Sequence, residues 1–253
     1  MRFNTLKNFI VGLSGGILGV FLFLLIVFSY PDNKLGAYIL SQFNINDSQS
    51  IENQKLAPTI LPSLAPDFWE SLSDNASLSS VAVQVFKENR LIKSGTGIIL
   101  SSDGLIIIPA DLTYSGGIYQ ILYEDKIMKG FVVLFDMQKN LAIIKIMSSE
   151  PNLNVSDLNV NFEYQSGQDV LITGKLSDFS KPVTVSQRGI VSYISGNRIV
   201  LDTFANTLLL GAKVLNSRGE LIGMLYIRGG KSYVISSKDI DNFFKEYLKQ
   251  TPQ

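Results

Sequence analysis

Short apolar runs separated by turn residues dominate the sequence between residues 78 and 235. The runs are rich in Val, Ile, Leu, Phe and Tyr, and no long helical pattern comes between them. Many short strands in succession favour a barrel or a sandwich. We therefore expect an all-β domain with strands at 81–86, 97–100, 105–108, 118–123, 129–135, 141–146, 170–173, 183–194, 198–202, 214–215, 221–227 and 233–235.

One helix is predicted after the last strand, at 238–248. Ser237 is a suitable N-cap residue for it, and the apolar residues that follow recur at helical spacing. Gly229 and Gly230, just before the last strand, are typical of a hairpin turn. The apolar face of the helix is expected to consist of Ile240, Phe243, Phe244, Tyr247 and Leu248.

Residues 9–30 form an uncharged, apolar segment. As a helix this segment reaches roughly 33 Å, which is enough to cross a hydrocarbon layer of about 30 Å. Basic residues precede it, so we expect residues 1–8 in the cytoplasm, one transmembrane helix and an extracytoplasmic remainder at the cell membrane. A cleaved signal peptide is the alternative, but its apolar region usually has only about 7–15 residues. Gly12, Gly16 and Gly19 have the small-residue spacing of associating helices, which suggests a homo-oligomer.

Residues 31–76 lose this regularity. Lys34 to Phe43 has the pattern of a short amphipathic helix, and prolines at 58, 62 and 66 then restrain the backbone. We expect an extended tether between the membrane and the β domain.

The chain contains no histidine and no cysteine, and its 22 basic residues equal its 22 acidic ones. Balanced charge gives no field that would attract nucleic acid, so no nucleic-acid partner is expected. Without histidine the chain cannot form a Ser-His-Asp triad. No cysteine-based site, metal cluster, phosphate-binding loop or dinucleotide motif is present, so no metal or cofactor is expected.

Eight segments of the β domain recur in a characteristic order: SGTGII at 94–99, DGLII at 103–107, FD at 135–136, NLAIIKI at 140–146, SGQDVLITG at 166–174, RGIVS at 188–192, RGELIG at 218–223 and YVIS at 233–236. In order and spacing these segments resemble those of trypsin-like serine proteases of the HtrA (Deg) group. A glycine before a strand usually marks only a turn, so the resemblance rests on the shared order and spacing of the segments.

The resemblance implies a chymotrypsin/trypsin-like double β-barrel domain at 77–249, followed by a tail at 250–253. The two barrels are expected at about 77–160 and 161–236, with a cleft between them and the helix after them. The family's usual PDZ domain is not expected after the resemblance ends at Leu248, because the chain ends at Gln253 and leaves no room for it.

The resemblance places Asp111 at the family's histidine, Asn140 at its aspartate and Leu210 at its serine. An aspartate with a pKa near 3.9 is a poor base for a hydroxyl, and an alkyl side chain cannot attack a carbonyl. Leu208, Leu209 and Gly211 occupy the loop that forms the family's oxyanion hole. A leucine at 208 disfavours the backbone conformation that a glycine permits.

We therefore expect no catalytic residues and no enzyme activity, but a membrane-anchored pseudoprotease that binds peptides or proteins at the interbarrel cleft. Two versions stay open: Leu208 to Leu210 form an apolar contact for a partner, or they fill the cleft as core. The alternatives are an active endopeptidase with a non-standard catalytic group and a regulatory subunit of an active membrane protease. Lys213 and Lys181, as bases for a serine, are interpreted as solvated surface charges.

Overall fold

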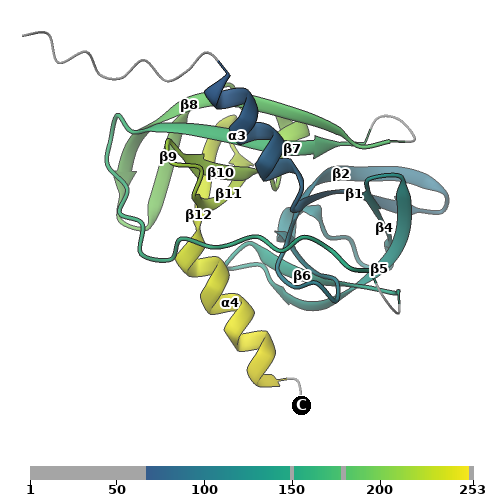
Figure 1. The fold of residues 1–253 in the computed structure, drawn as a ribbon. Helices are drawn as coiled ribbons and strands as arrows, with labels where there is room; N and C mark the ends of the chain where they lie inside the picture. The colour runs from purple at the N-terminus through teal and green to yellow at the C-terminus, as the bar shows by residue number, and fades with distance from the viewer. Residues whose placement is uncertain (1–66, 149–150, 178–180, 251–253) are drawn as a thin grey trace, which may run out of the picture. The chain divides into compact units, whose positions relative to one another are not determined.

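Twelve β-strands form two closed barrels in the computed structural model, which describes residues 67–148, 151–177 and 181–250 (Figure 1). The first barrel consists of β1 (Ser80–Lys87), β2 (Arg90–Ile99), β3 (Leu105–Pro109), β4 (Ile118–Tyr123), β5 (Lys126–Asp136) and β6 (Leu141–Ile146). The second consists of β7 (Asp169–Leu176), β8 (Val183–Ser195), β9 (Arg198–Asp202), β10 (Lys213–Asn216), β11 (Leu221–Arg228) and β12 (Lys231–Ser236). The helices are α3 (Phe68–Ser77), α4 (Ser237–Gln250) and the 3₁₀ turns η1 (Ala110–Leu112) and η2 (Thr207–Leu209).

The two barrels have the same strand order. Neighbours in the first barrel run β1-β2-β3-β6-β5-β4, and adding six to each number gives the order of the second barrel. Every pairing within the barrels is antiparallel, and closure leaves neither barrel with a free edge strand. This architecture, with the helix after it, confirms the predicted double β-barrel fold.

Strand β3 shows why the apolar runs are continuous rather than alternating. Ile106 and Ile108 point into the core of the first barrel, whereas Leu105 and Ile107 belong to a second buried cluster outside it. Successive side chains of a strand point to opposite faces, so both faces of β3 must be apolar.

That second cluster lies between the barrels. It combines Ile98 and Leu141 of the first barrel with Leu215 and Met224 of the second, and α4 contributes Phe243. A third cluster, which includes Val170, Ile172 and Leu209, fills the second barrel. The structure is therefore held by two barrel interiors and one shared layer.

Helix α4 begins one residue later than its capping side chain. The Ser236 hydroxyl accepts the Asp239 amide at 3.1 Å and donates to the Asp239 carboxylate at 2.6 Å, so Ser236 rather than the predicted Ser237 caps the helix. Ser237 instead donates to the Leu221 carbonyl at 2.7 Å. On the predicted apolar face Phe243 is 1% exposed, but Leu248 is 50% exposed.

Helix α3 falls within the last residues of the predicted tether. Trp69, Leu72 and Ala76 pack against the layer between the barrels, and Glu70 in the first turn suits the positive end of the helix dipole. Packing of these side chains favours a helix here, although the prolines at 58, 62 and 66 predict an extended tether through residue 76.

The predicted anchor at 9–30, with Gly12, Gly16 and Gly19, lies outside the described residues. Within residues 67–148, 151–177 and 181–250, neither helix combines the length and hydrophobicity needed to cross a bilayer.

Replacing Phe243 by alanine is expected to lower the free energy of unfolding by about 3–5 kcal/mol, because it leaves a cavity in the shared layer. Leu248→Ala, on the same helix but at an exposed position, should change it by less than about 0.5 kcal/mol. Denaturant unfolding measures both values. Equal effects of the two substitutions would show that α4 does not pack as described.

Candidate functional site

The structure brings Asp111 and Asn140 together. Asp111 lies in η1, directly after β3, and Asn140 lies directly before β6. The Asn140 side chain donates to Asp111 Oδ2 at 3.2 Å and accepts the Asp111 amide at 3.1 Å. The Asn140 carbonyl also accepts the Ala110 amide at 3.0 Å. Asn140 has a φ of 54°, a left-handed conformation that asparagine adopts more readily than most residues.

A lysine ties the same turn to strand β2. Lys93 Nζ donates to the Asp111 carbonyl at 2.6 Å and to the Thr113 carbonyl at 2.7 Å. These bonds hold the main chain and leave the exposed Asp111 carboxylate to Asn140 and solvent.

The loop at 208–211 has no free amides for an oxyanion. The amides of Leu208, Leu210 and Gly211 all donate within the protein. Their acceptors are Asn206 Oδ1, the Thr207 carbonyl and the Leu225 carbonyl, at 3.0, 3.2 and 2.9 Å. Because an oxyanion hole needs donors aimed at the reacting carbonyl, this loop is not organised as one.

The three leucines of this loop have different surroundings. Leu209 is 1% exposed in the core of the second barrel, and half-buried Leu210 packs against the core of the first. Leu208 is 41% exposed. The core-filling interpretation therefore describes Leu209 and Leu210, and only Leu208 presents substantial apolar surface.

Gly95 marks the place where the two triad-bearing segments meet. A Cβ atom at Gly95 would lie 2.6 Å from Leu112 Cδ1 and 2.6 Å from the Leu210 carbonyl oxygen. The neighbouring Thr96 amide donates to that carbonyl at 2.8 Å. Glycine is required here because η1 and the end of the Leu208–Leu210 loop approach the β2 backbone together.

A cavity of about 650 Å³ opens beside Asp111 and Asn140. The second barrel contributes Tyr226 and Arg228 to its wall, and α4 contributes side chains that include Phe243. We call this cavity the interbarrel cleft. Leu210 is not among the residues that line it.

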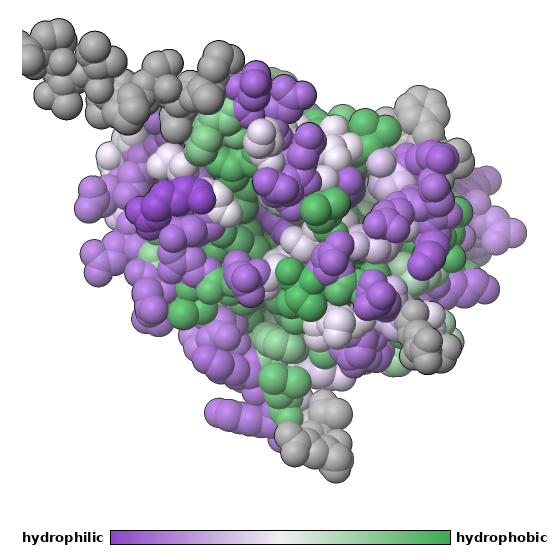
Figure 2. Space-filling view, viewed as in Figure 1, coloured by the Kyte–Doolittle hydropathy of each residue, from purple (hydrophilic) through white to green (hydrophobic). Residues whose placement is uncertain are grey.

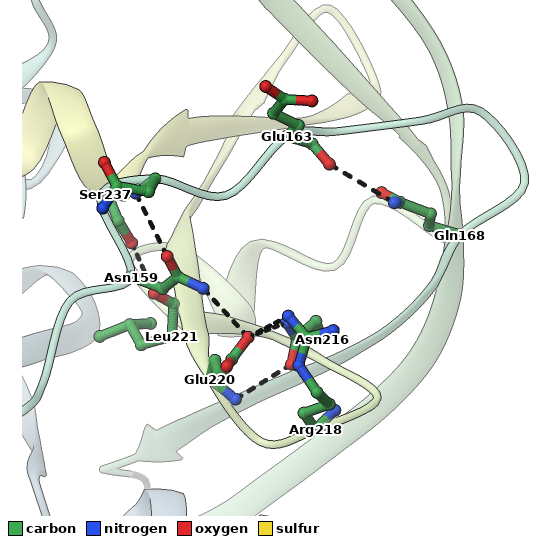
Figure 3. A network of polar contacts seen from close by, with 9 residues as sticks. Asn159, Glu163, Gln168, Asn216, Arg218, Glu220, Leu221 and Ser237 are labelled. Carbon is green, nitrogen blue, oxygen red and sulfur yellow. Dashed lines mark hydrogen bonds and ion pairs between the residues drawn. The ribbon is translucent and has the colours of Figure 1, made fainter.

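A separate polar network surrounds the turn between β10 and β11 (Figure 3). Three groups donate to Glu220 Oε2: Arg218 Nη2 at 2.7 Å, Asn216 Nδ2 at 2.6 Å and Asn159 Nδ2 at 3.0 Å. These hydrogen bonds lower the pKa of Glu220 to about 2, and the bond from Arg218 has the largest effect. The network fixes the turn to the connection between the barrels.

The main site feature that the sequence interpretation missed is Lys213. This side chain is 2% exposed, and its Nζ donates to the Ala76 carbonyl at 2.9 Å and to the Ser79 hydroxyl. The interpretation of Lys213 as a solvated charge is therefore wrong. Lys181, in contrast, is an exposed residue that pairs with Asp125 at 2.8 Å. The sequence signal that could have revealed this burial is the alternation of side chains along a strand, because Lys213 lies on the same face of β10 as the buried Leu215.

Comparison with known proteins gives relatives of one kind. Mouse serine protease HTRA4 is 30% identical over 202 residues, which are 72% of this chain and 41% of the relative. The serine endoprotease DegS of Haemophilus influenzae is 27% identical over 62% of this chain and 48% of the relative. This chain thus spans less than half the length of these relatives. No family model matches the chain.

Among solved structures, the crystal structure of the serine endoprotease from Yersinia pestis matches with a TM-score of 0.62 and 21% identity. The match covers 72% of this chain and 66% of that one, and it shows the fold. Two six-stranded barrels, with Asp111 and Asn140 beside a cleft, have the architecture of the class of trypsin-like serine protease domains. Within that class, the relatives are HtrA and DegS serine proteases, which confirms the predicted resemblance to the HtrA-like family.

These comparisons correct the expectation that the chain is not an enzyme, because the relatives are named serine proteases and serine endoproteases. The physical weakness of that expectation is that an absent histidine excludes only histidine-dependent catalysis. A lysine held beside a serine can serve as the base instead. Within the described residues, no group of three or more Asp, Glu, His or Cys side chains could hold a metal ion.

The Glu220 network makes stability depend on pH in a defined window. The folded-state pKa of Glu220, about 2, lies below the ordinary value of 4.5. The ionised carboxylate therefore contributes fully to the stability of the folded state above about pH 4.5, and this contribution disappears as the pH falls toward 2. Glu220→Gln should therefore flatten the fall of the melting temperature between these values. Glu163→Gln is the control, because Glu163 joins the neighbouring hydrogen bonds only through its main-chain carbonyl. Identical pH profiles for the two variants would contradict the assignment.

Proposed function

We propose that the chain is a membrane-anchored, HtrA-like module that binds an unfolded polypeptide segment in the interbarrel cleft. The observation that carries the proposal is the composition of the cleft wall. Amide side chains and a tyrosine line it together with charges of both signs, namely Gln138, Asn140, Asn197, Tyr226, Asn242, Asp111, Asp239, Glu246, Lys139, Arg228, Lys245 and Lys249.

This lining suits a main chain better than a small charged ligand. A polypeptide presents both N–H and C=O groups, and amide side chains can both donate to and accept from them. Mixed charges give no strong preference for an anion or a cation. On the face drawn in Figure 2, hydrophobic residues form separate patches among hydrophilic ones. That face therefore shows no broad apolar surface that would favour a protein interface over the cleft as the binding site.

The membrane part of the proposal rests on the sequence. Residues 9–30 contain no charged side chain, and basic residues precede them. Anchoring would hold the β domain at the extracytoplasmic surface of the cell membrane, where secreted or translocating polypeptides would reach it.

A serine-type endopeptidase that uses a group other than histidine is the second candidate function. The names of the relatives favour it. The triad-equivalent centre offers only the Asp111–Asn140 pair and an alkyl group, so such an activity requires another nucleophile.

Photo-crosslinking tests the cleft. We expect benzoylphenylalanine in place of Met137, which lines the cleft and is 61% exposed, to crosslink the full chain to reduced, fluorescent casein. The matched control is the same replacement at Ile127, which is 59% exposed but lies on β5 away from the cleft. Unlabelled casein should compete, and a folded globular protein should not. Equal crosslinking at both positions, or none at Met137, would refute polypeptide binding there.

Fractionation tests the anchor. The full chain should stay with membranes through alkaline carbonate washing, because an apolar helix is held by lipid rather than by charge. Deletion of residues 9–30 should move it to the soluble fraction. The anchor is disproved if the full chain is released by carbonate as completely as the deletion variant.

A further inference from the structure

A second cavity of about 590 Å³ lies apart from the interbarrel cleft. The C-terminal half of α3, the segment 155–159, β10 and the following turn line it. The two cavities share no lining residue. Part of its wall is apolar, formed by Leu72, Leu158 and Leu215.

Lys213 and Ser79 meet in the wall of this cavity. Lys213 projects from β10, and its Nζ is hydrogen-bonded to the Ser79 hydroxyl. Among the described residues, no carboxylate lies within ion-pair distance of Lys213. The amine therefore has one hydroxyl and one carbonyl, that of Ala76, as its protein partners.

The environment of Lys213 favours the neutral amine. Burial, with a smaller contribution from the positive charge of Lys175, lowers the pKa of Lys213 to about 7. A large fraction of this lysine is thus deprotonated near neutral pH and carries a free lone pair. When it does, the hydrogen bond can reverse, with the Ser79 hydroxyl donating to Nζ.

Ser79 is held in place while its hydroxyl stays accessible. It lies between α3 and β1, and its carbonyl accepts the Ser156 hydroxyl at 3.0 Å and the Ile99 amide at 3.3 Å. Its side chain is partly exposed and lines the cavity. A reacting carbonyl in the cavity would meet an oriented hydroxyl with a base behind it.

We propose that Ser79 and Lys213 form a nucleophile–base pair that hydrolyses carboxylic esters or amides with an apolar acyl group bound in this second cavity. The inference gives the second candidate function a named catalytic group. It is independent of polypeptide binding in the interbarrel cleft, so the failure of either proposal leaves the other in place.

The proposed reaction has two balanced halves. Lys213 Nζ takes the Ser79 proton while Oγ bonds to the carbonyl carbon. The tetrahedral intermediate then collapses, and the leaving alcohol or amine takes the proton from Lys213. Water next attacks the acyl carbon and gives a proton to Lys213. Release of the carboxylic acid returns that proton to Ser79, so one ester or amide and one water become an acid and an alcohol or amine.

A fluorophosphonate tests the pair in the full chain in detergent micelles. Ser79 Oγ would bond to phosphorus, fluoride would leave with the bonding electrons, and the hydroxyl proton would pass to Lys213. We expect mass spectrometry to place the adduct on Ser79. Ser79→Ala should abolish labelling, whereas Ser192→Ala, which removes an exposed hydroxyl on β8 away from this cavity, should preserve it.

The pH profile separates catalysis from a structural role. The labelling rate should rise through about pH 7 as Lys213 deprotonates, and Lys213→Met should lower it by about 100-fold or more. Lys175 on β7 is the charged group that acts on Lys213, and Asp74 on α3 acts in turn on Lys175. Asp157, Arg218 and Glu220 line the cavity. The proposal would be overturned by labelling at another serine or by undiminished labelling of Ser79→Ala. It would also be overturned if a chain that melts at its native temperature, and is therefore folded, is not labelled.

Discussion

The buried layer between the two barrels is the constraint on which the rest of the structure depends. It takes side chains from both barrels and from α4, and β3 contributes to it while also filling the first barrel. Close packing resists displacement of such a layer, so the strands that bound it are fixed relative to one another. Asp111 directly follows β3 and Asn140 directly precedes β6, and these strands are paired from Leu105–Lys145 to Pro109–Leu141. The geometry beside the interbarrel cleft is therefore set by the core.

The strands could be predicted because their residues are β-branched or aromatic and are bounded by turn residues. The order of the motifs also placed Asp111 near Asn140, since family resemblance carries topology with it. The turn at Gly229–Gly230 forms as expected, with positive φ at both residues. These features are local, or are conveyed by sequence order, and they need no knowledge of side-chain packing.

The features that could not be predicted depend on tertiary contacts. Helix α3 follows closely spaced prolines, and only its packing on the shared layer favours a helix there. Lys213 looks like a surface charge until β10 is paired between β7 and β11, which turns its side chain inward beside Ser79. The absence of histidine likewise excludes only a histidine-dependent mechanism. It gives no information about the proposed base, Lys213 on β10.

Helix α3 packs as part of the same folded unit as the barrels. A fragment cut at residue 77, where the family resemblance starts, would remove Trp69, Leu72 and Ala76 from the shared layer. It would also remove the carbonyl that Lys213 contacts and open this amine to water. Hydration would restore an ordinary ammonium ion, so such a fragment could keep both barrels and still misrepresent the acid–base chemistry of the intact chain.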